Sequence, residues 1–130
     1  MRIVAGILIG AAVAVACVFA IEWVGTMLYP APLGIDYDNP ADLERLMTLV
    51  APAQLAIVVF GWFLGALLGA WSANAFARRA PAGWAVALLV VALCVVNLIA
   101  LPHPAWMWAG GILLPPLGGW LAQRLAKVPF

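Results

Sequence analysis

Glu22 is the residue of this chain whose type and position point most directly to chemistry. It lies inside the long apolar stretch 3–29, a few residues before that stretch ends. A carboxylate inside a membrane span is costly and marks a candidate functional site, although near a helix end it also reaches headgroups or hydrogen-bonds a neighbouring helix. Both interpretations of Glu22, a ligand or proton site and a structural hydrogen-bonding group, stay open at this stage.

Three further polar side chains are predicted at the same end of the molecule as Glu22. Asn97 comes near the end of the third apolar stretch, His103 lies in the turn that follows it, and Gln54 stands at the start of the second. If these groups converge, a proton shared with an amide or an imidazole makes an exchangeable site. His103 lies between two prolines, which also fits a simple turn residue at the membrane interface.

The rest of the sequence contains no complete catalytic, metal-binding or nucleotide-binding motif. The acidic segment 36–42 lacks the glycine that a calcium loop needs midway, and it contains Pro40. No serine–histidine or paired-carboxylate pattern is found. We therefore predict no enzymatic activity, no metal and no cofactor.

The amino-acid composition indicates that most of this chain lies in a membrane. The 130 residues are 68% hydrophobic and 8% charged, whereas a soluble domain has about 25% charged residues. A net charge of +1 without a basic run argues against a nucleic-acid partner. Four apolar stretches are predicted to span the bilayer as helices, at about 3–29, 52–77, 84–101 and 105–122. The predicted fold is an all-α integral membrane four-helix bundle, with 1–130 as a single domain.

The segment 30–51 is predicted to be the one substantial loop, because it holds prolines, a glycine and all but one of the acidic residues. Within it, Asn39 followed by Pro40, Asp42 and Glu44 predicts a capped helix start with acids at the positive end of the helix dipole. We expect a short helix that lies on the outer membrane surface.

The distribution of lysine and arginine predicts the orientation of the chain. Cytoplasmic loops carry the excess of these residues. Five of them fall on one side of the predicted membrane and Arg45 alone falls on the other. Both termini are therefore expected in the cytoplasm, with the acidic loop outside.

Small residues recur along two of the predicted spans. They recur at every fourth position and would let helix backbones approach closely in lipid. Internal packing of the bundle and a self-association face both explain the pattern. The residues are Gly61, Gly65, Gly69 and Ala73 in the second span, and Gly6 and Gly10 in the first.

Pro115 and Pro116 fall within the fourth predicted span, between two pairs of glycines. Prolines inside a helix remove backbone hydrogen bonds, so a kink or break is expected there. A packing element is the default interpretation of this segment, and a hinge or gate is the alternative.

Residues 22–28 resemble the first-helix signature of the small multidrug resistance transporters, in which a glutamate is followed by glycine, threonine and leucine at the offsets of Glu22, Gly25, Thr26 and Leu28. The resemblance implies a proton-coupled antiporter built as a four-helix dimer, and it adds Thr26 to the candidate residues. The later motifs of that family are not found in this chain.

The whole chain resembles a group of small four-helix bacterial inner-membrane proteins to which no activity is assigned. The shared features are Glu22, a Tyr-Pro-x-Pro-x-Gly turn at 29–34, a glycine-rich second helix that ends in Arg-Arg, and an Asn-x-x-x-x-Pro-His-Pro stretch at 97–104. This resemblance implies a bacterial inner-membrane location.

Two functions follow as hypotheses. The first is a non-enzymatic binding or accessory subunit that interacts with lipid or with another membrane protein, with its acidic loop as the exposed surface. The alternative is a small proton-coupled transporter or channel that uses Glu22 and forms a homo-oligomer, in the simplest case a dimer.

Overall fold

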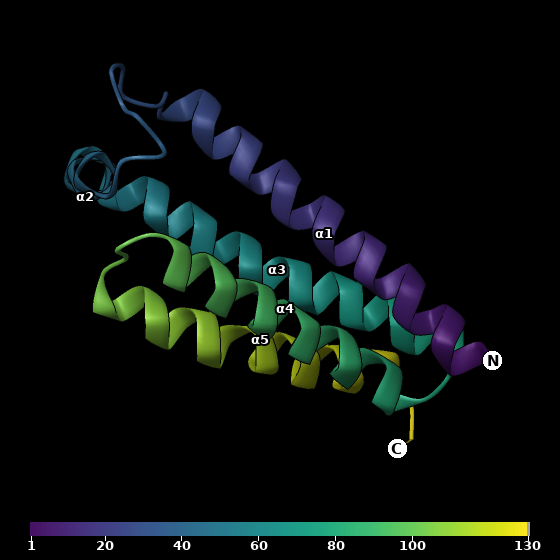
Figure 1. Cartoon of the computed structure of the whole chain (residues 1–130). Helices are drawn as coiled ribbons and strands as arrows, with labels where there is room; N and C mark the ends of the chain where they lie inside the picture. The colour runs from purple at the N-terminus through teal and green to yellow at the C-terminus, as the bar shows by residue number, and fades with distance from the viewer. Residues whose placement is uncertain (130) are drawn as a thin grey trace.

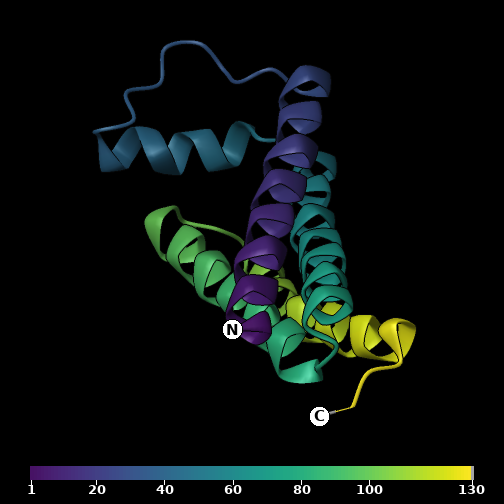
Figure 2. The same cartoon turned by 90° about the vertical axis from the view of Figure 1, so that its right-hand side faces the viewer.

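The computed structural model describes residues 1–129 and contains, within them, five α-helices and no strand. Four long helices run along the molecule, and α2 lies across one end of them (Figures 1 and 2). Both termini lie at the opposite end, so we call the two ends the α2 end and the terminal end. The helices are α1 (Arg2–Leu28), α2 (Pro40–Leu49), α3 (Pro52–Ala77), α4 (Ala80–Ala100) and α5 (Ala105–Ala126).

The all-α prediction is confirmed, but the prediction of four spans is supported for three helices only. By length and composition, α1, α3 and α4 are apolar enough to cross a membrane. Helix α5 is not among them, although its 22 residues would be long enough. Two prolines, four glycines and three tryptophans dilute its aliphatic residues, which lowers its mean hydropathy.

Helix α2 begins as its sequence predicts. The Asn39 side chain accepts a hydrogen bond from the Ala41 N–H at 3.0 Å, and Pro40 occupies the first helical turn. Leu46 is the buried residue of this helix. Arg45 donates to the Gly34 carbonyl at 2.7 Å, which ties the helix back onto the preceding loop.

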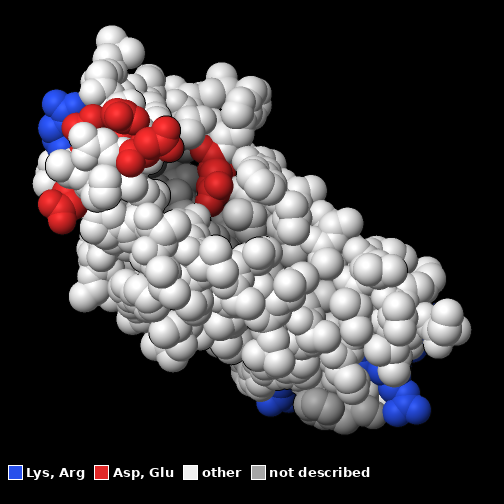
Figure 3. All heavy atoms as spheres, viewed as in Figure 1, with Lys and Arg blue, Asp and Glu red and all other residues white. Residues whose placement is uncertain are grey.

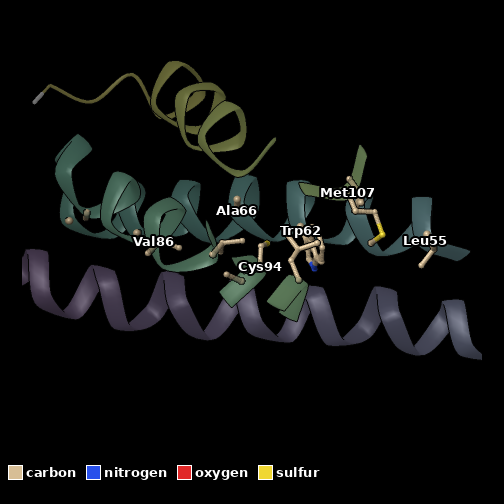
Figure 4. Packing of buried hydrophobic residues seen from close by; sticks show 13 residues of the cluster. Leu55, Trp62, Ala66, Val86, Cys94 and Met107 are labelled. Atoms are coloured by element: carbon tan, nitrogen blue, oxygen red, sulfur yellow. The ribbon is translucent and has the colours of Figure 1, made fainter. Parts of the chain in front are cut away.

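Helix α3 is the centre of the packing, because it contacts α1, α4 and α5. Its residues Leu55, Trp62 and Ala66 are buried in the cluster that Figure 4 shows, together with Cys94 of α4 and Met107 of α5. No side chain of this cluster is more than 8% exposed. Helix α3 is therefore the packing partner that α1, α4 and α5 share.

Glycines set the distance between α1 and α3. A Cβ atom added at Gly69 would lie 2.6 Å from the Gly10 carbonyl oxygen and 2.7 Å from the Ala14 Cβ, and one added at Gly10 would collide with the Gly69 carbonyl oxygen. At Gly65 the added atom would lie 2.7 Å from Val18. The small residues that recur along both helices thus face each other inside one chain.

Helix α5 continues through Pro115 and Pro116 without a break. Pro115 is buried, and the glycines around the prolines allow close approach to neighbouring helices. A Cβ atom at Gly118 would lie 3.0 Å from the Phe63 carbonyl oxygen, and one at Gly119 would lie 2.7 Å from the Ala87 Cβ. The segment therefore acts as a packing element between α3 and α4.

Replacing Gly69 with alanine should lower the free energy of unfolding by about 1–3 kcal/mol, because the methyl group has no space against the α1 backbone. Reversible unfolding in mixed micelles, followed by circular dichroism, measures this change. Gly25→Ala is the matched control, since its added atom would lie 3.3 Å from the Ile57 side chain, which can shift. Equal stability of the two variants would contradict the backbone contact.

Candidate functional site

A cleft of about 310 Å³ lies between α1 and α4. In its α1 wall and its α4 wall the lining positions, single residues or adjacent pairs, recur every three to four residues, so each wall lies along one face of a helix. Trp62 of α3 lies between the two walls. The wall residues are Ala11, Ala14, Val15, Val18, Phe19 and Glu22 from α1, and Leu89, Val90, Leu93, Cys94 and Asn97 from α4.

The cleft is deep in the bundle on one side and open on the other. Ala14, Trp62 and Cys94 are 1 to 2% exposed and form its floor. Phe19 is 67% exposed and Leu93 is 49% exposed, so these two side chains form its rim. The cleft therefore opens on the side of the bundle, between Phe19 of α1 and Leu93 of α4.

The divergence of α1 from α4 produces this shape. The two helices are close near the terminal end, where a Cβ atom at Gly10 would lie 2.9 Å from Val86 Cγ2. Toward the α2 end they separate, as Figures 1 and 2 show. The cleft is thus closed at the terminal end, and the two helices that form its walls diverge toward the α2 end.

Glu22 and Asn97 are the only carboxylate and the only side-chain amide among the lining residues. Both are half-buried. Each is the lining residue of its helix nearest to the α2 end, while the remaining wall is dominated by aliphatic and aromatic side chains. The cleft therefore has a polar end and a long apolar part.

The other three residues predicted from the sequence lie elsewhere. His103 lines a shallow groove with Glu44 of α2, and its Nδ1 lies 2.9 Å from the Leu101 carbonyl oxygen. Gln54 lines neither of the two hollows. The Thr26 hydroxyl donates to the Trp23 carbonyl at 2.8 Å within its own helix. The structure thus brings Asn97, and not the others, to the cleft that contains Glu22.

Two of the acidic side chains in 30–51, Asp36 and Asp42, accept hydrogen bonds from backbone N–H groups of the same segment. The Asp36 N–H donates to Asp42 at 2.9 Å, and the Asp38 N–H donates to Asp36 at 3.0 Å. Asp42 also lies 3.6 Å from the Arg45 guanidinium. Across residues 1–129, no three His, Cys, Asp or Glu side chains come together in a way that could hold a metal ion.

Charge is strongly separated along the molecule. Figure 3 shows the acidic side chains at the α2 end and, apart from one basic patch beside them, the lysines and arginines at the terminal end. That exception is Arg45, the only Lys or Arg in 30–51. The polar end of the cleft therefore lies in the acidic half of the molecule.

Asn74 was not identified from the sequence, yet it is a fully buried polar residue of the bundle. Its Oδ1 accepts a hydrogen bond from the Gly83 N–H at 2.7 Å, and its Nδ2 has no partner. Gly83 has no side chain to interfere, since a Cβ there would lie 2.5 Å from the Asn74 amide. This hydrogen bond, which we call the Asn74–Gly83 clamp, joins α3 to α4. An asparagine nine residues before a glycine, with a tight turn between two helices in between, is the sequence signal that could have revealed it.

Comparison of the chain with protein-family models, with curated proteins and with solved structures gives no match.

Replacing Asn74 with alanine should lower the free energy of unfolding by about 1–3 kcal/mol, because the buried Gly83 N–H loses its acceptor. Thermal unfolding in detergent, monitored by circular dichroism, gives the comparison with the wild type. Ser72→Ala is the control, since the Ser72 hydroxyl donates to Leu68 of its own helix at 2.8 Å and links no second helix. An equal loss of unfolding free energy in Ser72→Ala would show that the Asn74–Gly83 clamp stabilises the protein no more than a hydrogen bond within one helix.

Proposed function

We propose that this chain is a non-enzymatic four-span protein of the bacterial inner membrane, with both termini in the cytoplasm, that acts by binding lipid or another membrane protein. The observation that carries the proposal is the sideways-opening cleft between α1 and α4. A hollow of this kind within apolar helices is accessible to molecules that lie in the bilayer.

The packing of α5 supports a fourth span in spite of its lower hydropathy. Met107 and Ala122 near its two ends are fully buried, so α5 is held to the bundle along its length. The Trp84 indole N–H donates to Gln123 at 2.9 Å and joins the start of α4 to the end of α5. Leu113 and Leu125 are exposed on its outer side, as lipid-facing residues would be. Twenty-two residues of helix extend about 33 Å, slightly more than the hydrocarbon core.

The separation of charge supports the orientation. The arginines and the lysine at the terminal end match the excess of positive charge that cytoplasmic segments carry. The acidic loop and α2 would then lie on the outer surface. These positive residues are Arg2, Arg78, Arg79, Arg124 and Lys127.

The cleft has the properties of a binding site. Its volume of about 310 Å³ is at the lower end of the range for ligand pockets, about 300–1,000 Å³. Such pockets are mostly apolar and orient their ligand with a few polar groups, as Glu22 and Asn97 could do here. Binding is therefore the function that this arrangement supports best.

Filling the cleft should displace its occupant. Native mass spectrometry after mild detergent extraction is expected to find lipid or a partner retained by the wild type, and several-fold less retained by Leu93→Trp, whose side chain lies at the rim. Leu88→Trp is the matched control, because Leu88 is exposed on α4 outside the cleft. A wild-type monomer that retains neither lipid nor partner would refute the proposal.

A small proton-coupled transporter or channel is the second candidate, in the simplest case a dimer. It is favoured by the presence of Glu22 and Asn97 in the same cleft, where a carboxylate that gains and loses a proton would face a hydrogen-bonding amide. The carboxylate is then the group on which coupling depends.

For this candidate, Glu22→Gln should reduce proton flux into proteoliposomes to the rate of protein-free liposomes, because the glutamine side chain does not gain or lose a proton. A pH-sensitive dye inside the vesicles measures the flux under an imposed pH gradient. Glu44→Gln, which changes an exposed acid of α2 outside the cleft, should keep the wild-type rate. Unchanged flux in Glu22→Gln would remove this residue from the mechanism, and a wild type without flux would remove the candidate.

A further inference from the structure

We propose that the cleft between α1 and α4 binds an aminophospholipid of the outer leaflet, with one acyl chain along its apolar part and the primary ammonium group hydrogen-bonded to Glu22. This inference rests on the function proposed above and names the ligand of the same cleft. Four observations carry it: the polarity of the cleft, the depth of Glu22 in the membrane, the closed end of the cleft and the charge of its lining.

The polarity of the cleft matches that of a lipid. Glu22 and Asn97 lie at the α2 end, and the apolar walls extend from them toward the terminal end. The helical rise between Ala11 and Glu22 is about 16 Å, which is enough for much of an acyl chain. A lipid with its headgroup outward would place polar atoms at Glu22 and its chain against the apolar walls.

Glu22 lies at the depth where headgroups begin. The helical rise between Arg2 and Glu22 is about 30 Å, which equals the thickness of a typical hydrocarbon core. With Arg2 at the inner interface, the Glu22 carboxylate reaches the outer boundary of the hydrocarbon. A headgroup can therefore meet this carboxylate without leaving its leaflet.

The closed end of the cleft favours a lipid chain over a helix of a partner protein. Gly10 of α1 and Val86 of α4 are in contact just beyond the apolar end of the cleft. A transmembrane helix has to continue across the whole bilayer, and this contact blocks its path along the cleft. An acyl chain ends within its leaflet, so it needs only the part that is open.

The charge of the cleft selects the headgroup. The lining includes one carboxylate and no Lys, Arg or His, so an anionic lipid would find no countercharge there. Arg45, the only Lys or Arg in 30–51, is engaged with Gly34 and Asp42. A primary ammonium, by contrast, donates charge-assisted hydrogen bonds to a carboxylate. The Asn97 amide has two N–H donors for phosphate or ester oxygens.

The test uses the full chain in nanodiscs that contain equal amounts of phosphatidylethanolamine, phosphatidylcholine and phosphatidylglycerol, followed by native mass spectrometry of the retained lipid. Phosphatidylethanolamine should be enriched about tenfold over each of the others, as one charge-assisted hydrogen bond allows. Phosphatidylcholine is the informative comparison, because its ammonium group has a charge but no N–H donor. Glu22→Gln should remove most of the enrichment, and Glu44→Gln should leave it unchanged.

Retained lipid with no headgroup preference, or equal retention of phosphatidylcholine and phosphatidylethanolamine, would overturn the inference. In that case the proposed binding function still stands if Leu93→Trp releases the lipid and Leu88→Trp does not. A wild type that holds neither lipid nor partner overturns both. The headgroup comparison in the wild type does not depend on the variants, so it decides the inference even if Glu22→Gln does not fold.

Discussion

Contact between the backbones of α1 and α3 is the constraint on which the arrangement of the bundle depends. In lipid, apolar side chains gain little by leaving the hydrocarbon, so helices associate mainly through van der Waals contact and hydrogen bonds. At Gly10 and Gly69 the two backbones are so close that a Cβ atom on either residue would overlap the carbonyl oxygen of the other. Helix α1 is otherwise largely exposed, since only 17% of its most apolar 18-residue segment is buried. Its position is therefore determined by a narrow strip of small residues.

The cleft is a geometric consequence of that strip. Because α1 follows α3, and α4 follows a different face of α3 at an angle, α1 and α4 touch near the terminal end and separate toward the α2 end. Side chains on the two diverging walls do not fill the space between α1 and α4, so an apolar hollow remains there, with Trp62 at its floor. The packing of the helices thus brings Glu22 and Asn97, one polar residue from each wall, to the α2 end of the same hollow.

The elements of the fold follow from the sequence more directly than the site does. Apolar length predicts the long helices, and Asn39 with Pro40 predicts the start of α2, because these signals act within a few residues along the chain. The grouping of Glu22 with Asn97 depends on the angle between α1 and α4, which no local pattern encodes. For His103 the sequence left two interpretations open, convergence with Glu22 or a turn residue at the interface, and the structure places it in the turn, in a groove that α2 helps to form. Asn74 was missed because its partner is a backbone N–H, which every residue type except proline provides.

The floor and the rim of the cleft differ in how strongly a substitution there would disturb the packing of the helices. Trp62, Cys94 and Ala14 belong to the close-packed interior, where most substitutions would disturb several helices. Phe19 and Leu93 border the same hollow yet face outward, so changes there carry little structural penalty. Descendants of this chain could therefore alter which molecule they accept by substituting the rim, while inheriting the scaffold intact.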